Sequence, residues 1–170
     1  MKVLTKAYGL VEVDDRQKIL FPVGLFGYET IQDYVLLESE QQPFYWLQSV
    51  DVEQVAFILV NPFLFRPDYE VDISDDELKE IGLIDPKEAL IFAIVTSPEE
   101  GPATANLQGP LVINRKTRMG MQGVLADSRW KTKHDIIAEL TAQRKFQEES
   151  ESAAVTGNHI STDSTRNGQC

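Results

Sequence analysis

Asn106-Leu107-Gln108-Gly109-Pro110-Leu111-Val112-Ile113-Asn114 is the stretch of sequence that decides the fold. Its branched apolar residues have strong β propensity, and the Gly-Pro pair in its middle is a turn signal. We therefore predict a strand over 103–108, a corner at Gly109-Pro110 and a second strand over 111–114. The polar side chains of the stretch are amides, which recognise partners through hydrogen bonds and do not react, so the stretch indicates a binding protein.

The same pattern extends along the chain from residue 3 to about residue 124. Short segments rich in Val, Ile, Leu, Phe and Tyr alternate with Gly, Pro and Asp clusters, which is typical of antiparallel strands joined by turns. We predict an all-β fold, a small antiparallel barrel-like domain, because closure is how a small β domain hides its edges. The remaining strands are expected at 3–7, 10–13, 18–21, 34–38, 44–49, 55–61, 89–96 and 121–125.

Helical signals are few. Ser74-Asp-Asp-Glu77 fits a capping box and predicts a short helix that ends at Gly82, and Asp85-Pro86 predicts a single turn. We divide the chain into a barrel-like binding domain over 1–134, a helix over 135–147 and a disordered tail over 148–170. The tail has almost no bulky apolar residues, so it cannot compensate the entropy of ordering.

Composition limits the classes of function. The net charge is -11, from 27 acidic and 16 basic residues, which disfavours nucleic acid as a direct partner and suits a basic protein, although it also serves solubility. No apolar run has the length of a membrane span or a signal peptide. The single cysteine, Cys170, excludes an internal disulfide. We expect a cytoplasmic monomer without membrane contact.

Enzyme signatures are missing from the sequence. His134, His159 and one terminal cysteine cannot form a familiar metal set, and no phosphate loop or serine elbow is present. We therefore expect no catalytic residue, cofactor or metal. One rival is a barrel that binds or hydrolyses a small molecule in its cavity, using carboxylates such as Glu29 and Asp127 with a raised pKa. Another is a structural unit that self-associates through an apolar rim.

Two stretches are candidate binding surfaces. Asn61-Pro62-Phe63-Leu64-Phe65-Arg66-Pro67 is apolar and bracketed by prolines, which favours an irregular rim. Residues 68–80 carry seven carboxylates without the spacing of a calcium loop, so a basic partner fits them better than a cation. The candidate partner-binding residues are Phe44, Trp46, Asn61, Phe63, Phe65, Asp72, Asp75, Asp76, Glu77, Asn106, Leu107, Ile113 and Asn114.

Several motifs resemble those of the flagellar assembly factor FliW family. They are Phe21-Pro-Val-Gly-Leu-Phe-Gly-Tyr-Glu29, Pro43-Phe-Tyr-Trp-Leu-Gln-Ser49, the segment 106–114 and Arg129-Trp-Lys-Thr-Lys-His134. The chain departs from the family pattern at Leu25-Phe26, where Ile-Pro is usual, and residues from 135 onward exceed the usual family length.

The resemblance implies a non-catalytic cytoplasmic protein that binds newly made flagellin as a chaperone. It also implies binding to the translational regulator CsrA, which relieves repression of flagellin mRNA until accumulating flagellin displaces the regulator. For the regulator, the resemblance favours a contact outside its RNA-binding surface. Flagellin helices would need an apolar groove, which Phe44, Trp46, Phe63, Phe65 and the 107–113 strand could line. The basic regulator would meet residues 68–80.

Overall fold

The computed structural model describes residues 1–158, so the part of the predicted tail over 159–170 lies outside the described residues. Strands dominate, with three 3-10 turns and two α-helices. In chain order the elements are β1 Lys2–Thr5, β2 Gly9–Glu12, η1 Asp15–Gln17, β3 Lys18–Leu20, β4 Asp33–Glu38, β5 Tyr45–Ser49, β6 Ala56–Val60, η2 Pro62–Leu64, α1 Asp75–Lys79, η3 Pro86–Glu88, β7 Ala89–Thr96, β8 Thr104–Asn114, β9 Gly120–Gln122, β10 His134–Asp135 and α2 Ile136–Asn158.

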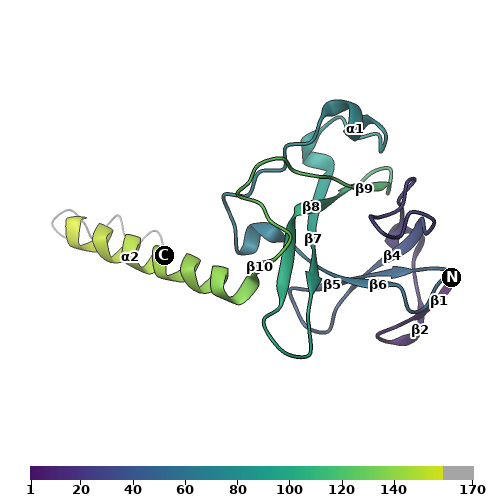
Figure 1. The fold of residues 1–170 in the computed structure, drawn as a ribbon, viewed down its shortest axis with the longest axis horizontal. Coiled ribbons are helices and arrows are strands. Elements are labelled where there is room, and N and C mark those ends of the chain that lie inside the picture. The colour runs from purple at the N-terminus through teal and green to yellow at the C-terminus, as the bar shows by residue number, and fades with distance from the viewer. Residues whose placement is uncertain (159–170) are drawn as a thin grey trace.

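The strands form an antiparallel sheet that curls almost into a barrel (Figure 1). Its order is β10-β8-β7-β6-β5-β4-β3, with β9 paired to β8, and β1 and β2 form a separate hairpin. The sheet nearly closes on itself where β3 meets the turn between β8 and β9. There the backbone N–H of Leu20 donates to the carbonyl of Arg118 at 2.9 Å. The predicted all-β, barrel-like fold is confirmed.

Alternation of side chains along β7 divides the interior into two main clusters. Phe92 packs with residues of β3, β4 and β5 in one cluster, while Ala93 and Val95 pack in the other with residues of β6 and β8. The apolar run over 89–96 is continuous because both faces of this strand meet other side chains.

The Gly109-Pro110 pair does not separate two strands, as the sequence predicted. Thr104–Asn114 is one continuous strand, and its register against β7 shifts between Phe92 and Ile94. Two steps along β7 there correspond to five along β8, an irregularity in register that, like a β-bulge, bends a strand without ending it. The bend lets β8 contribute to both clusters, with Leu107 in one and Leu111 and Ile113 in the other.

The short helices begin at the predicted caps. The Ser74 hydroxyl accepts from the Glu77 N–H at the start of α1, and the Asp85 carboxylate accepts from the Lys87 N–H at 3.0 Å at the start of η3. Gly82, with a φ of 70°, follows α1 in the left-handed conformation that glycine adopts without strain.

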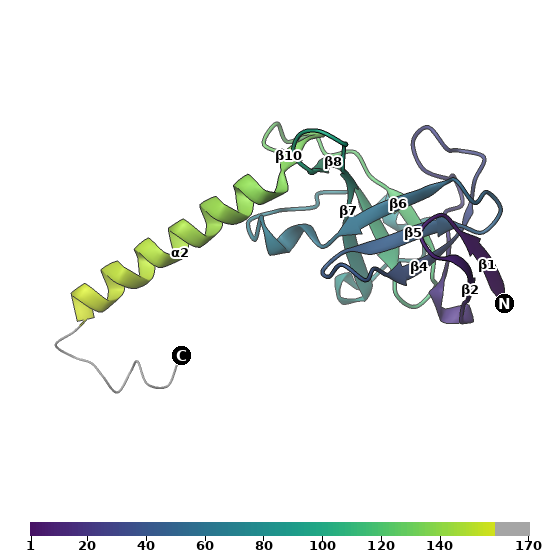
Figure 2. The same cartoon turned by 90° about the horizontal axis from the view of Figure 1, so that it is seen from below.

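Helix α2 extends away from the barrel (Figure 2) and is longer than predicted. Residues 148–158, where the sequence predicts the start of a disordered tail, continue the helix, and Glu148, Glu149, Ala153 and Ala154 in this stretch are strong helix formers. Only its first turns dock: Ile136 and Leu140 pack on the barrel, whereas Ile137 and Phe146 are each 65% exposed. No helix among the described residues is both long and apolar enough to cross a membrane.

Candidate partner-binding surfaces

The aromatic rim, residues 61–66, lies directly after β6. The Asn61 side chain accepts from the Phe63 N–H at 3.0 Å, and Pro62 occupies the first position of η2, so the turn is fixed at its start. The turn exposes two adjacent apolar side chains, Phe63 at 40% and Leu64 at 48%. The rim therefore presents a small apolar surface on a defined backbone.

A stack of aromatic rings supports the rim from beneath. The ring of Phe63 lies 5.8 Å from that of Tyr69, which meets Trp130 edge to face at 4.8 Å. The Tyr69 hydroxyl donates to the carbonyl of Leu107 at 2.6 Å, and burial raises the pKa of this hydroxyl. The stack connects the rim to β8, and edge-to-face aromatic pairs stabilise by about 1 kcal/mol beyond their burial.

Two guanidinium groups flank Trp130. Arg66 and Arg129 lie 4.7 Å and 4.9 Å from the centre of its ring, within the range of cation–π attraction. Arg66 donates two hydrogen bonds to the Asp68 carboxylate, at 2.9 Å and 2.8 Å, and these bonds lower the pKa of Asp68. Hydrogen bonds from Arg129 likewise lower the pKa of Asp127.

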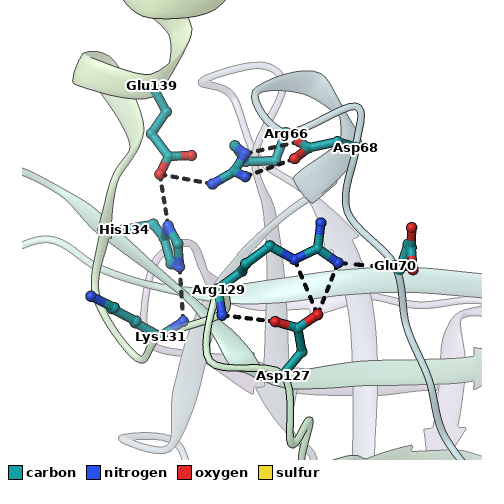
Figure 3. A network of polar contacts seen from close by, with 8 residues as sticks. All are labelled: Arg66, Asp68, Glu70, Asp127, Arg129, Lys131, His134 and Glu139. Carbon is teal, nitrogen blue, oxygen red and sulfur yellow. Dashed lines mark hydrogen bonds and ion pairs between the residues drawn. The ribbon is translucent and has the colours of Figure 1, made fainter.

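A polar network joins this region to α2, as Figure 3 shows. The His134 Nε2 atom accepts from the Lys131 N–H at 2.9 Å, and its Nδ1 atom lies 2.7 Å from the Glu139 carboxylate. Because Nε2 accepts, Nδ1 carries the proton and donates to Glu139. The same carboxylate oxygen lies 3.5 Å from Arg66. The network thus connects the rim, the loop before β10 and the first turn of α2.

The acidic helix surface comprises Asp72, Asp75, Asp76 and Glu77, all of which are exposed. Three of them lie in the first turn of α1, where the helix dipole favours negative charge. None of the four forms an ion pair with another described residue. Their charges are consequently available to a cationic partner, and this surface lies on a different element from the aromatic rim.

The residues predicted to line an apolar groove do not lie together on the surface of the described part of the chain. Phe65 is 1% exposed, and Leu107 and Ile113 are fully buried, so these three side chains fill the interior. Trp46 packs with the β1–β2 hairpin, whereas Phe44 packs on the cluster that contains Phe65. We therefore assign Phe65, Leu107 and Ile113 to the core, because other side chains cover them almost completely.

The amides of the 106–114 segment hold the backbone. Asn114 is buried; its Nδ2 donates to the Ile81 carbonyl at 2.9 Å, and its Oδ1 accepts from the N–H groups of the following turn. The Asn106 Oδ1 accepts from the N–H groups of Gln108 and Gly109. Both side chains shape a turn or bulge, which is a common role of asparagine that the sequence pattern alone does not separate from recognition.

The carboxylates of the described part of the chain were compared with what a metal site or a catalytic carboxylate requires. No three His, Cys, Asp or Glu residues gather there as a metal would require. The rival prediction of a catalytic carboxylate needs a raised pKa, but the hydrogen bonds from Arg129 lower the pKa of Asp127. Glu29 accepts from the N–H of Gly27 at 2.8 Å and stabilises the corner that contains it.

Sequence reasoning missed the network around Trp130. Arg129, Trp130 and His134 belong to one sequence motif, but Arg66, which contacts Trp130 and Glu139, lies more than sixty residues before them in the chain. One signal for this network is present in the sequence: Arg66 directly follows Phe65, and Arg129 directly precedes Trp130. Arginine side chains often stack on aromatic rings.

These observations define the class of protein: a small, nearly closed antiparallel β-barrel with an exposed aromatic rim, an acidic helix surface and a C-terminal helix. The family model described as FliW protein matches residues 2–136. The flagellar assembly factor FliW of Treponema denticola is 54% identical, over 84% of this chain and 97% of that protein. The flagellar assembly factor FliW of Treponema pallidum is 45% identical, over 88% of this chain and 99% of that protein.

A solved structure leads to the same family. The crystal structure of the flagellar assembly factor FliW superposes with a TM-score of 0.74 at 34% identity, covering 80% of this chain and 96% of that one. The chain belongs to the FliW family. Most of α2 lies beyond the matched residues.

Proposed function

We propose that this chain is a non-catalytic flagellar assembly factor that binds flagellin at the aromatic rim and a basic, CsrA-type regulator at the acidic helix surface. Family membership supports the flagellar role, since the similar proteins are named flagellar assembly factors. The observation that supports two partners is the presence of two chemically different surfaces on separate elements, with apolar Phe63 and Leu64 on η2 and unpaired carboxylates on α1.

Flagellin binding at the rim is tested with Leu64→Ser, because Leu64 is half exposed and its loss disturbs the core less than loss of Phe63. We expect at least a tenfold weaker affinity for the host flagellin by titration calorimetry, about 1.4 kcal/mol. Phe146→Ser on α2 is the matched control, since Phe146 is exposed away from the barrel and should leave the affinity unchanged. Equal affinities for both variants would remove the rim from the flagellin site.

Regulator binding at the acidic helix surface is tested with the double variant Asp75→Asn and Asp76→Asn. Glu77 is left intact because its carboxylate lies 3.3 Å from the Ser74 hydroxyl that caps the helix. Glu99→Gln with Glu100→Gln makes the same change of charge on an exposed loop. We expect a slower association rate with the regulator only in the first double variant, and a smaller dependence of that rate on salt.

A further inference from the structure

A cavity of about 410 Å³ opens in the barrel wall where β3 and β4 approach the β8–β9 hairpin. Its apolar wall includes Ile19, Leu20 and Val50, and Arg118 of the hairpin lines it as well. Its volume falls within the range of sites that hold small organic molecules. The cavity is distinct from both the aromatic rim and the acidic helix surface.

The structure holds Arg118 in an unfavourable conformation. Its φ is 59°, in the left-handed region that a non-glycine residue enters at a cost. The backbone is fixed there by two hydrogen bonds, from its N–H to the Asn114 carbonyl and from the Leu20 N–H to its own carbonyl, both at 2.9 Å. The backbone that carries the Arg118 side chain is therefore hydrogen-bonded on both its N–H and its carbonyl.

The guanidinium of Arg118 lacks a counter-charge among the described residues. Its Nε atom is buried without a hydrogen-bond partner, and the group forms no ion pair there. Burial lowers the pKa of Arg118 from its usual value. Arg66 and Arg129, in contrast, each bind a carboxylate. An unpaired buried donor is costly, so the position favours an anion.

Other charged groups around the cavity limit the negative charge that a bound anion can carry. The Asp15 carboxylate already pairs with Lys18 at 3.2 Å, and the N-terminal ammonium of Met1 lies 3.3 Å from Glu12. Asp33 adds a further negative charge to the lining. A dianion such as phosphate would be repelled by these carboxylates more strongly than a group with a single charge.

We propose that this cavity binds a small organic carboxylate, whose carboxylate group accepts hydrogen bonds from Arg118 while its apolar body packs against Ile19, Leu20 and Val50. The planar guanidinium matches the two oxygens of a carboxylate, which gives charge-assisted hydrogen bonds with defined geometry. The site does not depend on flagellin or on the regulator, so its test is independent of the proposed function.

The test is a titration of the full chain with sodium butyrate, followed by the backbone amide signals in NMR spectra at constant ionic strength. We expect saturable shifts at Leu20, Arg118 and Met119, and no such shifts with butyramide, which has the same shape without the charge. Arg118→Gln should weaken the binding at least tenfold. Arg115→Gln, an exposed neighbour in the same hairpin with the same loss of charge, should bind like the original chain.

Well-dispersed spectra of both variants show that the barrel is intact, and Arg118→Lys, which keeps the charge without the planar fork, should bind more weakly than the original chain. Three results would overturn the proposal: shifts that never saturate, equal shifts with butyramide, or unchanged butyrate binding in Arg118→Gln.

Discussion

Tyr34 places a hydroxyl group in the interior, where it has no hydrogen-bond partner among the described residues. Burial raises the pKa of this hydroxyl to about 12. Tyr34→Phe removes the unpaired group, so we expect the free energy of unfolding at pH 7 to stay the same or rise by up to about 1 kcal/mol. Urea unfolding measures it, and a loss well above 1 kcal/mol would show that the hydroxyl has a partner.

The raised pKa of Tyr34 also predicts a dependence on pH. The contribution of a group whose pKa is raised on folding is fully present below its unfolded pKa, about 10 for tyrosine, and is lost as the pH rises towards about 12. The original chain should therefore lose stability in this window faster than Tyr34→Phe. Parallel unfolding curves at pH 9 and pH 11 measure the difference; identical losses would contradict the assignment.

Asp68 gives the opposite dependence of stability on pH from that of Tyr34. The hydrogen bonds from Arg66 lower its pKa, so its contribution is present above the unfolded pKa of about 3.9 and is lost as the pH falls through the lower folded value. The carboxylate is half exposed, so Asp68→Asn should cost less than about 1 kcal/mol at pH 7. Below pH 4, Asp68→Asn should lose less of its free energy of unfolding than the original chain does. An equal loss in both would contradict the ion pair between Arg66 and Asp68.

At the scale of elements, the corner over 21–29 depends on Gly24. Its φ is 70°, and a Cβ atom there would lie 2.6 Å from the Tyr28 carbonyl oxygen and 2.7 Å from Glu29. Gly27, with a φ of 87°, has open space around it. Both alanine variants incur the left-handed strain, but Gly24→Ala also forces the backbone apart, so it should destabilise by at least about 2 kcal/mol more. Equal thermal midpoints for the two variants would contradict this packing.

Helix α2 depends on its first turns. Ile136, Glu139 and Leu140 contact the barrel, whereas Phe146 does not. We expect Leu140→Ala to destabilise the protein by about 1–2 kcal/mol, and truncation after residue 147 to leave the thermal midpoint unchanged. A truncated chain that melts clearly earlier would show that the distal helix contributes to stability.

The limits of sequence reasoning are clearest in β8 and α2. Alternating apolar segments and turn residues were sufficient to predict the barrel class and the caps at Ser74 and Asp85, because these signals are local. The Gly109-Pro110 pair predicted a corner, but pairing with β7 on one side keeps the strand continuous through an irregularity in register. Leu107 and Ile113 were expected at a surface, and only the closure of the sheet shows that they are buried.

For the molecule as a whole, the proposed function has two partners that bind separate elements of one barrel. Displacement of one partner by the other then requires coupling through the barrel, and such coupling is reciprocal: flagellin lowers the affinity for the regulator by the same factor by which the regulator lowers the affinity for flagellin. The aromatic stack from Phe63 through Tyr69 to Trp130 is one contact that joins the rim to the barrel, and buried Phe65 is another.

The central claim is tested most directly by titration calorimetry of the full chain against the host's flagellin, against its CsrA-type regulator, and against each preformed complex. The account predicts binding to both partners, with a weaker apparent affinity for the regulator once flagellin is bound. Absence of binding to either partner would contradict it.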